Sequence, residues 1–414
     1  MLDLTKLAQQ MQGMSQHLTK EAMAAKNRLE IAQQLLEAAK DEQEDLLALE
    51  ESWCDRILFN PAIPIESLDT YPLINPPPKS HTVFATDGSQ IAPSQHEIAY
   101  CYLLNIGRVM LHYGESRYPL LDSIPEIFYE PGDLYISRQW GIKTEEWMGY
   151  RRTISEALVL AQLGCEWVKN NSDNLGSPIL AMVDGSLIYW FLESLPSEAR
   201  DRILNPIMEA WNKLKLAGIP LVGYLSASRS NESLSFLRLK ACIYDEPDCI
   251  SNCPNVGLGG FGFTEKAPCQ SFEPLRDVIF WGSILRPGQR SPLWQSSARI
   301  LHLYGDNTIY FCYVNVGREV ARIDMPEWVV ENEEMLELVL GMILAQVQKG
   351  YGYPVALAEA HNQAVVRGGD RISFFALLEQ EMIKAGLKNV GTSYKETRAD
   401  VCIVPLKVQC FTLQ

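Results

Sequence analysis

The tripeptide Asp-Gly-Ser occurs twice in this chain, each time at the end of a β-like, largely apolar run. The first run is His-Thr-Val-Phe-Ala-Thr before Asp87, and the second is Pro-Ile-Leu-Ala-Met-Val before Asp184. Each run predicts a buried strand that delivers a carboxylate to a sheet edge, and the following glycine allows a tight turn or a close ligand approach. Two carboxylates brought together in this way predict a divalent-metal site, although Asp-Gly by itself more commonly marks a plain turn.

Composition limits the classes of protein that the chain can belong to. Its 414 residues are enough for one large elaborated domain with appendages. No apolar run approaches the roughly 20 residues that span a bilayer, and the first residues lack a secretory pattern, so we expect a cytoplasmic protein that does not bind membranes. The ten cysteines are scattered, which favours free thiols over disulfides. A net charge of −15 argues against a general polyanion binder, although an acidic protein can still line a cleft with a few arginines.

The chain divides into three regions by composition. Residues 1–57 contain no proline and have leucines near helical spacing, which predicts a long amphipathic helical segment that packs on a partner or on the body. Residues 58–80 are rich in proline and predict a linker. The main domain is expected to cover 81–405.

The order of elements in the main domain predicts its fold class. Three β-like runs come first, at 81–92 and twice within 97–114, followed by a loop rich in Pro, Tyr and Asp. The rest alternates: helix 145–169, strand 179–188, helix 196–217 and strand 219–226. This order predicts an α/β protein with a ribonuclease H-like mixed sheet flanked by helices.

Residues 229–330 break this alternation and are interpreted as an inserted, β-containing segment. Two β-like runs lie near 309–316 and 319–324. Four cysteines within 28 residues form a candidate site for zinc or an iron-sulfur cluster: Cys242, Cys249, Cys253 and Cys269. Their spacing lacks the paired short knuckles of a zinc ribbon, so plain core thiols are the alternative.

The C-terminal part contains a second group of chemically useful side chains. A helix predicted over 331–349 leads into Tyr353-Pro354, and Pro354 suits the first turn of another helix. That helix carries His361. A histidine of this kind is commonly a plain core or surface residue, but here it accompanies a carboxylate pair and a tyrosine.

Asp87-Gly-Ser, Asp184-Gly-Ser and Tyr353-Pro…His361 together resemble the motifs of the NurA nuclease family over most of the chain. The resemblance implies a ribonuclease H-like, manganese-dependent DNA nuclease that acts in DNA end resection with the hexameric HerA translocase. It also implies a homodimer, with Asp87 and Asp184 as metal ligands and Tyr353 and His361 completing the site.

Members of the family also use a glutamate on the helix between the two aspartate strands. Glu156 is our choice because it lies mid-helix behind Arg151 and Arg152, a basic pair suited to phosphate. The competing candidates in and near this helix are Glu145, Glu146 and Glu166.

The turn near Ser226 departs from the family, which often has a lysine there. This chain reads Ser226-Ala-Ser-Arg229-Ser, and Arg229 can grip a phosphate but cannot act as a general base.

These residue types suit phosphodiester hydrolysis by two divalent ions about 4 Å apart, which supply a hydroxide nucleophile and stabilise the leaving oxygen. Carboxylates suit Mg²⁺ or Mn²⁺, and a neutral His361 nitrogen favours Mn²⁺. Two alternatives stay open. One is a metal-dependent hydrolase of small phosphate esters, and the other is a non-catalytic or translocase-dependent assembly module.

Overall fold

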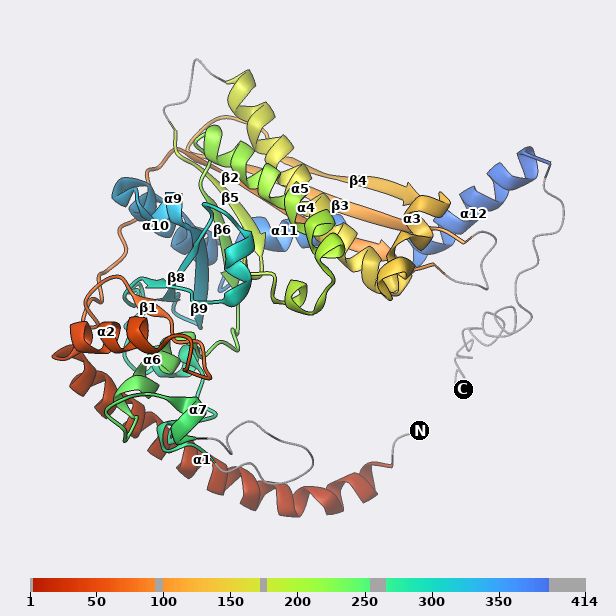
Figure 1. The fold of residues 1–414 in the computed structure, drawn as a ribbon. Helices are drawn as coiled ribbons and strands as arrows, with labels where there is room; N and C mark the ends of the chain where they lie inside the picture. The colour runs from red at the N-terminus through yellow and green to blue at the C-terminus, as the bar shows by residue number, and fades with distance from the viewer. Residues whose placement is uncertain (1–2, 94–99, 172–176, 254–265, 387–414) are drawn as a thin grey trace, which may run out of the picture.

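The computed structural model describes residues 3–93, 100–171, 177–253 and 266–386, in which a nine-stranded mixed sheet has the order β1-β7-β8-β9-β6-β5-β2-β3-β4 (Figure 1). The strands are β1 (Ile63–Pro64), β2 (His81–Ile91), β3 (Tyr102–Tyr113), β4 (Leu120–Phe128), β5 (Ile179–Asp184), β6 (Leu221–Leu225), β7 (Trp294–Gln295), β8 (Ile309–Asn315) and β9 (Val320–Pro326). The helices are α1 (Leu4–Lys40), α2 (Gln43–Trp53), α3 (Pro131–Tyr135), α4 (Thr144–Asn170), α5 (Ser197–Leu216), α6 (Glu232–Lys240), α7 (Cys249–Asn252), α8 (Asp277–Gly282), α9 (Glu327–Val330), α10 (Glu333–Lys349), α11 (Val355–Ala364) and α12 (Gly368–Lys384). The expected start of the second β-like run at 97–99 and the expected end of the main domain at 387–405 lie outside the described residues.

The centre of the sheet joins an antiparallel meander to parallel strands. Strands β2, β3 and β4 pair antiparallel, whereas β5 runs parallel to both β2 and β6. A parallel pair needs a crossover connection, and the long helix α4 supplies the one between the meander and β5. The prediction of a mixed α/β sheet with flanking helices is confirmed.

The third strand of the meander lies where the sequence predicted a loop, so placing two strands within 97–114 was wrong. Strand β3 occupies 102–113 alone, and β4 follows at 120–128. β4 is an edge strand with mainly exposed or partly exposed side chains, and it contains Pro125 opposite Asn105. Proline and acidic residues are typical of loops, so the sequence predicted one here. An edge strand tolerates both, because the backbone groups on its unpaired side form no hydrogen bonds with another strand.

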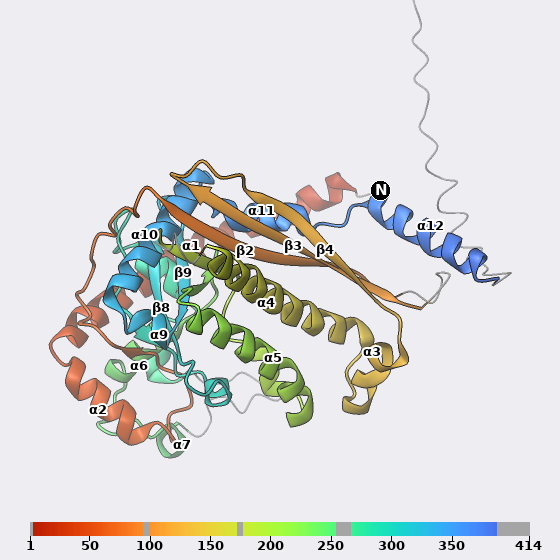
Figure 2. The same ribbon diagram turned by 90° about the horizontal axis from the view of Figure 1, so that it is seen from above.

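Helices cover both faces of the meander, with α4 and α5 on one side and α11 on the other (Figure 2). On α4, Ile154, Ala157, Leu160 and Ala161 are buried at helical spacing, which explains why this stripe packs on the sheet. On the opposite face α11 approaches β3 closely at Gly107, where a Cβ would meet the Ala360 carbonyl oxygen. The absence of a side chain at Gly107 therefore lets α11 lie directly on the strand.

The N-terminal helices and the segment after β6 share a second hydrophobic core. Leu36 of α1 and Leu46 of α2 are buried with Phe236 of α6 and Trp281 of α8. The β-like runs predicted near 309–316 and 319–324 are confirmed as β8 and β9, which continue the main sheet through pairing of β9 with β6. The expected bounds of linker, domain and insertion stay predictions. Within the described ranges, no helix is both long and apolar enough to cross a membrane.

Candidate active site

The two aspartates of the repeated tripeptide lie at corresponding positions on adjacent parallel strands. Thr86 of β2 is paired with Val183 of β5, so Asp87 and Asp184 come one residue later on both strands. Side chains at matching positions of neighbouring strands leave the sheet on the same face. Asp184 ends β5 as expected, and Gly185 then turns the chain with φ 118°. Asp87 does not end its strand, because β2 continues to Ile91 in pairing with β3.

Helix α11 brings His361 to Asp87. The His361 Nδ1 and Asp87 Oδ2 atoms are 2.8 Å apart, while Asp87 Oδ1 accepts a 2.8 Å hydrogen bond from the Gly88 amide. The carbonyl of Ala364, at the end of α11, accepts a hydrogen bond of 2.8 Å from Asn105 and another from Ser89. The first Asp-Gly-Ser therefore supplies a candidate ligand from its Asp and an anchor for α11 from its Ser.

Tyr353, just before α11, closes the site over Asp184. Its hydroxyl hydrogen-bonds to the Asp184 carboxylate, and its ring packs edge-on against Tyr224 with centroids 5.6 Å apart. Burial raises the Tyr353 pKa well above its ordinary value, and the negative charge of Asp184 adds to this. Burial also raises the pKa of Asp184, with Asp87 adding to the rise and the Tyr353 hydrogen bond opposing it. The tyrosine therefore stays protonated at neutral pH and acts as a hydrogen-bond donor.

Glu156 of α4 approaches the same strand from the other face. A Cβ on Gly88 would lie 2.5 Å from Glu156 Oε1, so the glutamate occupies the space that a side chain would fill. Burial raises the pKa of Glu156 to about 8, and Asp87 and Asp184 add to the rise while Arg152 opposes it. The Arg152 Nε lies 3.3 Å from Glu156 Oε1. The absence of a side chain at Gly88 thus lets Glu156 approach β2 closely, and the glycine does not form a turn.

The three competing glutamates have other surroundings. Glu146 accepts a 2.7 Å hydrogen bond from Tyr150 on the surface of α4, and Glu166 accepts one of 2.8 Å from Gln162. Glu145 is exposed in the first turn of the helix. Of the four, Glu156 is the one that lies against Gly88 of β2, and the charges of Asp87 and Asp184 are among the causes of its raised pKa.

The three arginines proposed to bind phosphate have different surroundings in the structure. Arg152 lies at Glu156, but its neighbour Arg151 lies over the Phe128 ring, 5.2 Å from the ring centroid. Arg229 is exposed in the segment after β6. Their binding to DNA stays a prediction.

A buried polar network behind the second tripeptide was not predicted. Asp324 of β9 accepts hydrogen bonds from the Ser186 hydroxyl at 2.6 Å and the Leu187 amide at 3.2 Å, and Arg322 holds its other oxygen at 2.7 Å. Asp324 and Arg322 are almost completely buried. The sequence contains one signal of this network: Arg322 and Asp324 are two residues apart in an otherwise apolar strand, so they lie on the same face of it.

Glu319, between β8 and β9, was also missed. It accepts hydrogen bonds from Tyr224 at 3.0 Å and Ser226 at 2.7 Å, and its charge contributes to the raised Tyr353 pKa. It therefore adds a fourth acidic group close to the tyrosine side of the site.

The donor set fits a hard divalent cation, because carboxylate oxygens and an imidazole nitrogen suit Mg²⁺ or Mn²⁺. Loss of solvation raises the pKa of both Glu156 and Asp184, and the charge of Asp87 adds to both shifts. A bound cation would favour the ionised form of both carboxylates. In the part of the chain that the structure describes, no three His, Cys, Asp or Glu side chains already form a metal-ligand shell. Instead His361, Tyr353 and Arg152 each contact one carboxylate, so ion binding requires these contacts to rearrange.

The chain is thus a mixed α/β protein with two aspartates on adjacent parallel strands and a histidine above them on α11. The model of one family, described as the NurA domain, matches residues 81–366. The match covers more than half of the chain, which therefore belongs to the NurA family.

Solved structures with low sequence identity also match. The NurA nuclease from Sulfolobus solfataricus is 12% identical over 86% of this chain and 98% of its own, with a TM-score of 0.44. A structure of NurA with manganese is 11% identical over 86% and 99%, with a TM-score of 0.35. NurA bound to dAMP and manganese is 12% identical over 83% and 96%, with a TM-score of 0.33. Among curated proteins, none matches the chain.

Proposed function

We propose that this NurA family member is a metal-dependent deoxyribonuclease that hydrolyses phosphodiester bonds with two divalent ions, with Mn²⁺ favoured over Mg²⁺. The observation that carries the proposal is the placement of Asp87 and Asp184 at matching positions of β2 and β5, with His361 on Asp87 and Tyr353 on Asp184. Membership of the NurA family supports the same activity.

Two metal ions would supply a hydroxide nucleophile and stabilise charge on the departing oxygen. Asp87, Asp184 and His361 would hold them from the α11 face, and Glu156 would contribute from the α4 face through the space left by Gly88. Tyr353, which stays protonated, would donate to a water or a phosphate oxygen. Arg152 would neutralise a non-bridging oxygen, with Arg151 and Arg229 further out along the DNA.

The strand order supports a ribonuclease H-like core for this activity. Strands β4-β3-β2-β5-β6 lie side by side, with the meander first in sequence and α4 and α5 connecting the parallel strands. We place this nuclease domain at 81–405, with an insertion at about 229–330, the N-terminal helical segment at 1–57 and the linker at 58–80.

Its biological setting follows from the family resemblance. We propose a cytoplasmic homodimer that processes DNA double-strand break ends, as an exonuclease, an endonuclease or both, with a HerA-type hexameric ATPase as partner.

The decisive experiment is cleavage of end-labelled single- and double-stranded DNA with Mn²⁺, Mg²⁺ or EDTA. Wild type is compared with Asp87→Ala and Asp184→Ala, and with Glu166→Gln as a control carboxylate on the surface of α4. We expect metal-dependent cutting that both aspartate variants lose and the control retains.

Other outcomes point to the alternatives. Hydrolysis of p-nitrophenyl phosphate without cutting of DNA would indicate a small phosphate esterase. A folded wild type that cuts nothing with any of the ions would exclude an autonomous nuclease and favour an assembly module that depends on its translocase. Cutting that survives both aspartate substitutions would show that the active site lies elsewhere.

A further inference from the structure

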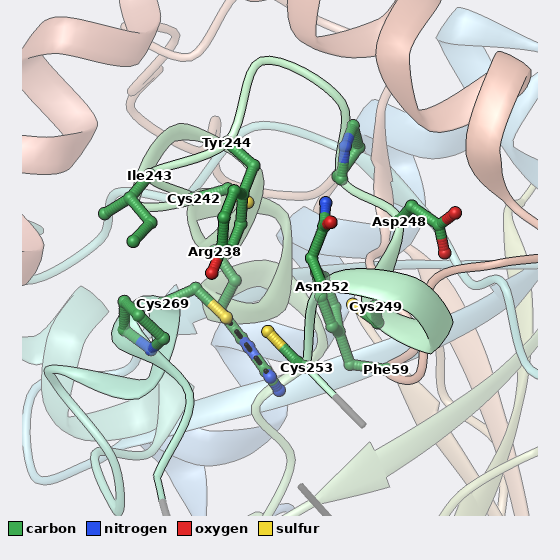
Figure 3. Close-up of a pocket in the computed structure, with 12 residues that line it drawn as sticks. Phe59, Arg238, Cys242, Ile243, Tyr244, Asp248, Cys249, Asn252, Cys253 and Cys269 are labelled. Atoms are coloured by element: carbon green, nitrogen blue, oxygen red, sulfur yellow. Dashed lines mark hydrogen bonds between the residues drawn. The ribbon is translucent and has the colours of Figure 1, made fainter. Parts of the chain in front are cut away.

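Four cysteines from three segments of the chain line a single pocket. Cys242 follows α6, Cys249 and Cys253 lie at the two ends of α7, and Cys269 lies in the short helix η4 (Pro268–Gln270). All four are free thiols. Figure 3 shows that Cys253 and Cys269 direct their sulfur atoms toward the same space beside Arg238. The fold thus gathers thiols whose spacing along the chain has no paired knuckles.

A buried cation lies against this group. Arg238, which is 9% exposed, donates a hydrogen bond from Nη2 to Cys269 Sγ at 3.5 Å. Its guanidinium also contacts Glu273 at 3.1 Å and lies 3.9 Å from the Phe59 ring centroid. The Nε atom is buried and has no hydrogen-bond partner within the described residues. A positive group that donates to a sulfur stabilises its thiolate and supports it as a metal ligand. Burial acts in the opposite direction and raises the pKa of the Cys242 and Cys253 thiols, so a bound metal would have to displace their protons.

We propose that these four cysteines bind a thiophilic metal centre through four thiolates, either one Zn²⁺ or an iron-sulfur cluster. Four-thiolate coordination is the geometry that zinc and iron-sulfur sites share. On binding, four S–H protons pass to solvent and four sulfur–metal bonds form, with no change in the oxidation state of sulfur. Across the described parts of the chain the thiols do not already form a ligand shell, so the side chains must turn further into the pocket.

The surroundings of the pocket give this centre a structural role. Asp248 caps α7 by accepting from the Ser251 amide at 3.0 Å, and Arg56, just beyond α2, lies 2.6 Å from the same carboxylate. A metal centre would join the end of α6 to α7 and η4, and Arg56 would tie all three to the N-terminal helices. This role is independent of the proposed nuclease activity.

The test measures metal in the full-length protein, purified anaerobically without chelator. We expect about one zinc per chain by mass spectrometry, or iron and acid-labile sulfide with visible absorption, which distinguishes the two kinds of centre. Removing the metal should make four further thiols reactive toward a thiol reagent and should lower the melting temperature. Cys253→Ser and Cys269→Ser should lose the metal, whereas Cys54→Ser, an exposed cysteine outside the pocket, should retain it.

A second measurement tests the proposal even if the serine variants fail to fold. Metal-free wild type is titrated with Co²⁺, and we expect the intense visible bands of a four-thiolate cobalt site at about one equivalent. The proposal is overturned if folded wild type contains no zinc or iron and gives no such bands. It is also overturned if the four cysteines form disulfides in the purified protein, or if Cys253→Ser and Cys269→Ser fold and keep the metal.

Discussion

Asp87 and His361 are separated by 274 residues in sequence, yet Asp87 Oδ2 and His361 Nδ1 lie 2.8 Å apart. The other Asp87 oxygen accepts from the Gly88 amide, so both oxygens of the carboxylate are oriented. Strand β2 and helix α11 thereby orient the carboxylate in the metal-free protein, and the His361 contact must rearrange when an ion binds.

His361→Ala should weaken Mn²⁺ binding about 10- to 100-fold, because it removes a candidate ligand that also orients Asp87. Folding should be unaffected, since the His361 side chain is 64% exposed. Isothermal titration of Mn²⁺ measures the change, with His302→Ala as an exposed histidine control. An unchanged Kd in His361→Ala would exclude a role for this histidine at the metal.

The metal-free protein should lose stability as pH rises from about 4.5 to about 8. Glu156 has its pKa raised from 4.5 to about 8 in the folded state, so between these values the folded protein holds a proton that the unfolded chain has released. Melting temperatures in EDTA across this pH range test the slope, which Glu156→Gln should reduce. Mn²⁺ affinity should rise with pH over the same window, because the ion competes with this proton. A stability that increases with pH in EDTA, equally in both proteins, would refute the shift.

Gly88→Ala should impair the site while Gly149→Ala should not. A Cβ at position 88 would lie 2.5 Å from Glu156 Oε1 and 2.6 Å from Arg152 Cγ, whereas one at position 149 would meet nothing within 4 Å. We expect Gly88→Ala to cost about 1–3 kcal/mol of folding stability through overpacking and to reduce cleavage. Gly149→Ala lies within helix α4 and should be neutral or stabilising by about 0.5–1 kcal/mol. Denaturant unfolding and cleavage assays make the comparison, and equal behaviour of the two variants would contradict it.

Ser186→Ala and Asp324→Asn should both destabilise the protein, and Asp324→Asn should do so more strongly. Ser186→Ala removes one hydrogen bond to Asp324 and should cost about 1 kcal/mol. Asp324→Asn leaves Arg322 with one fewer buried charge partner and should cost about 3–5 kcal/mol. Both should also slow cleavage, because the network holds the turn after Asp184. Denaturant unfolding measures the costs, and a smaller loss for Asp324→Asn than for Ser186→Ala would be inconsistent with a buried ion pair.

Arg152→Ala should reduce cleavage more than Arg151→Ala. Arg152 contacts Glu156, whereas Arg151 packs over Phe128. The salt dependence of DNA binding should weaken in Arg152→Ala, because the proposed phosphate contact would be lost. Binding and single-turnover cleavage over a range of salt concentrations provide the measurement, and a larger effect of Arg151→Ala would move the phosphate site toward β4.

Residue patterns predicted the mixed sheet because apolar runs such as the one before Asp184 have the period and length of strands. They failed at β4, where Pro125 and acidic residues read as a loop because edge position is a property of the assembled sheet. They also placed Asp87 at a strand end, since the sequence does not show that β3 keeps pairing with β2 beyond it.

The candidate site was also predicted in part. Asp87, Asp184, Tyr353 and His361 were singled out by motif, and Glu156 was chosen over its competitors for its position in the helix. Its close approach to Gly88 could not be predicted, because it depends on how α4 lies on the sheet. The Ser186–Asp324 contact spans 138 residues and rests on the pairing of β9 with β6, a long-range pairing that local periodicity does not encode.

The packing of α11 on β2 and β3 has a consequence during synthesis of the protein. During synthesis the ribosome releases Asp87 and Asp184 long before His361, and the cluster cannot form until α11 has emerged and packed on β2 and β3. Contacts between residues so far apart in sequence carry a large loop-closure entropy cost, which slows their formation. A nascent chain that does not yet include α11 lacks the Asp87–His361 contact, which forms only after α11 has left the ribosome and packed on the sheet.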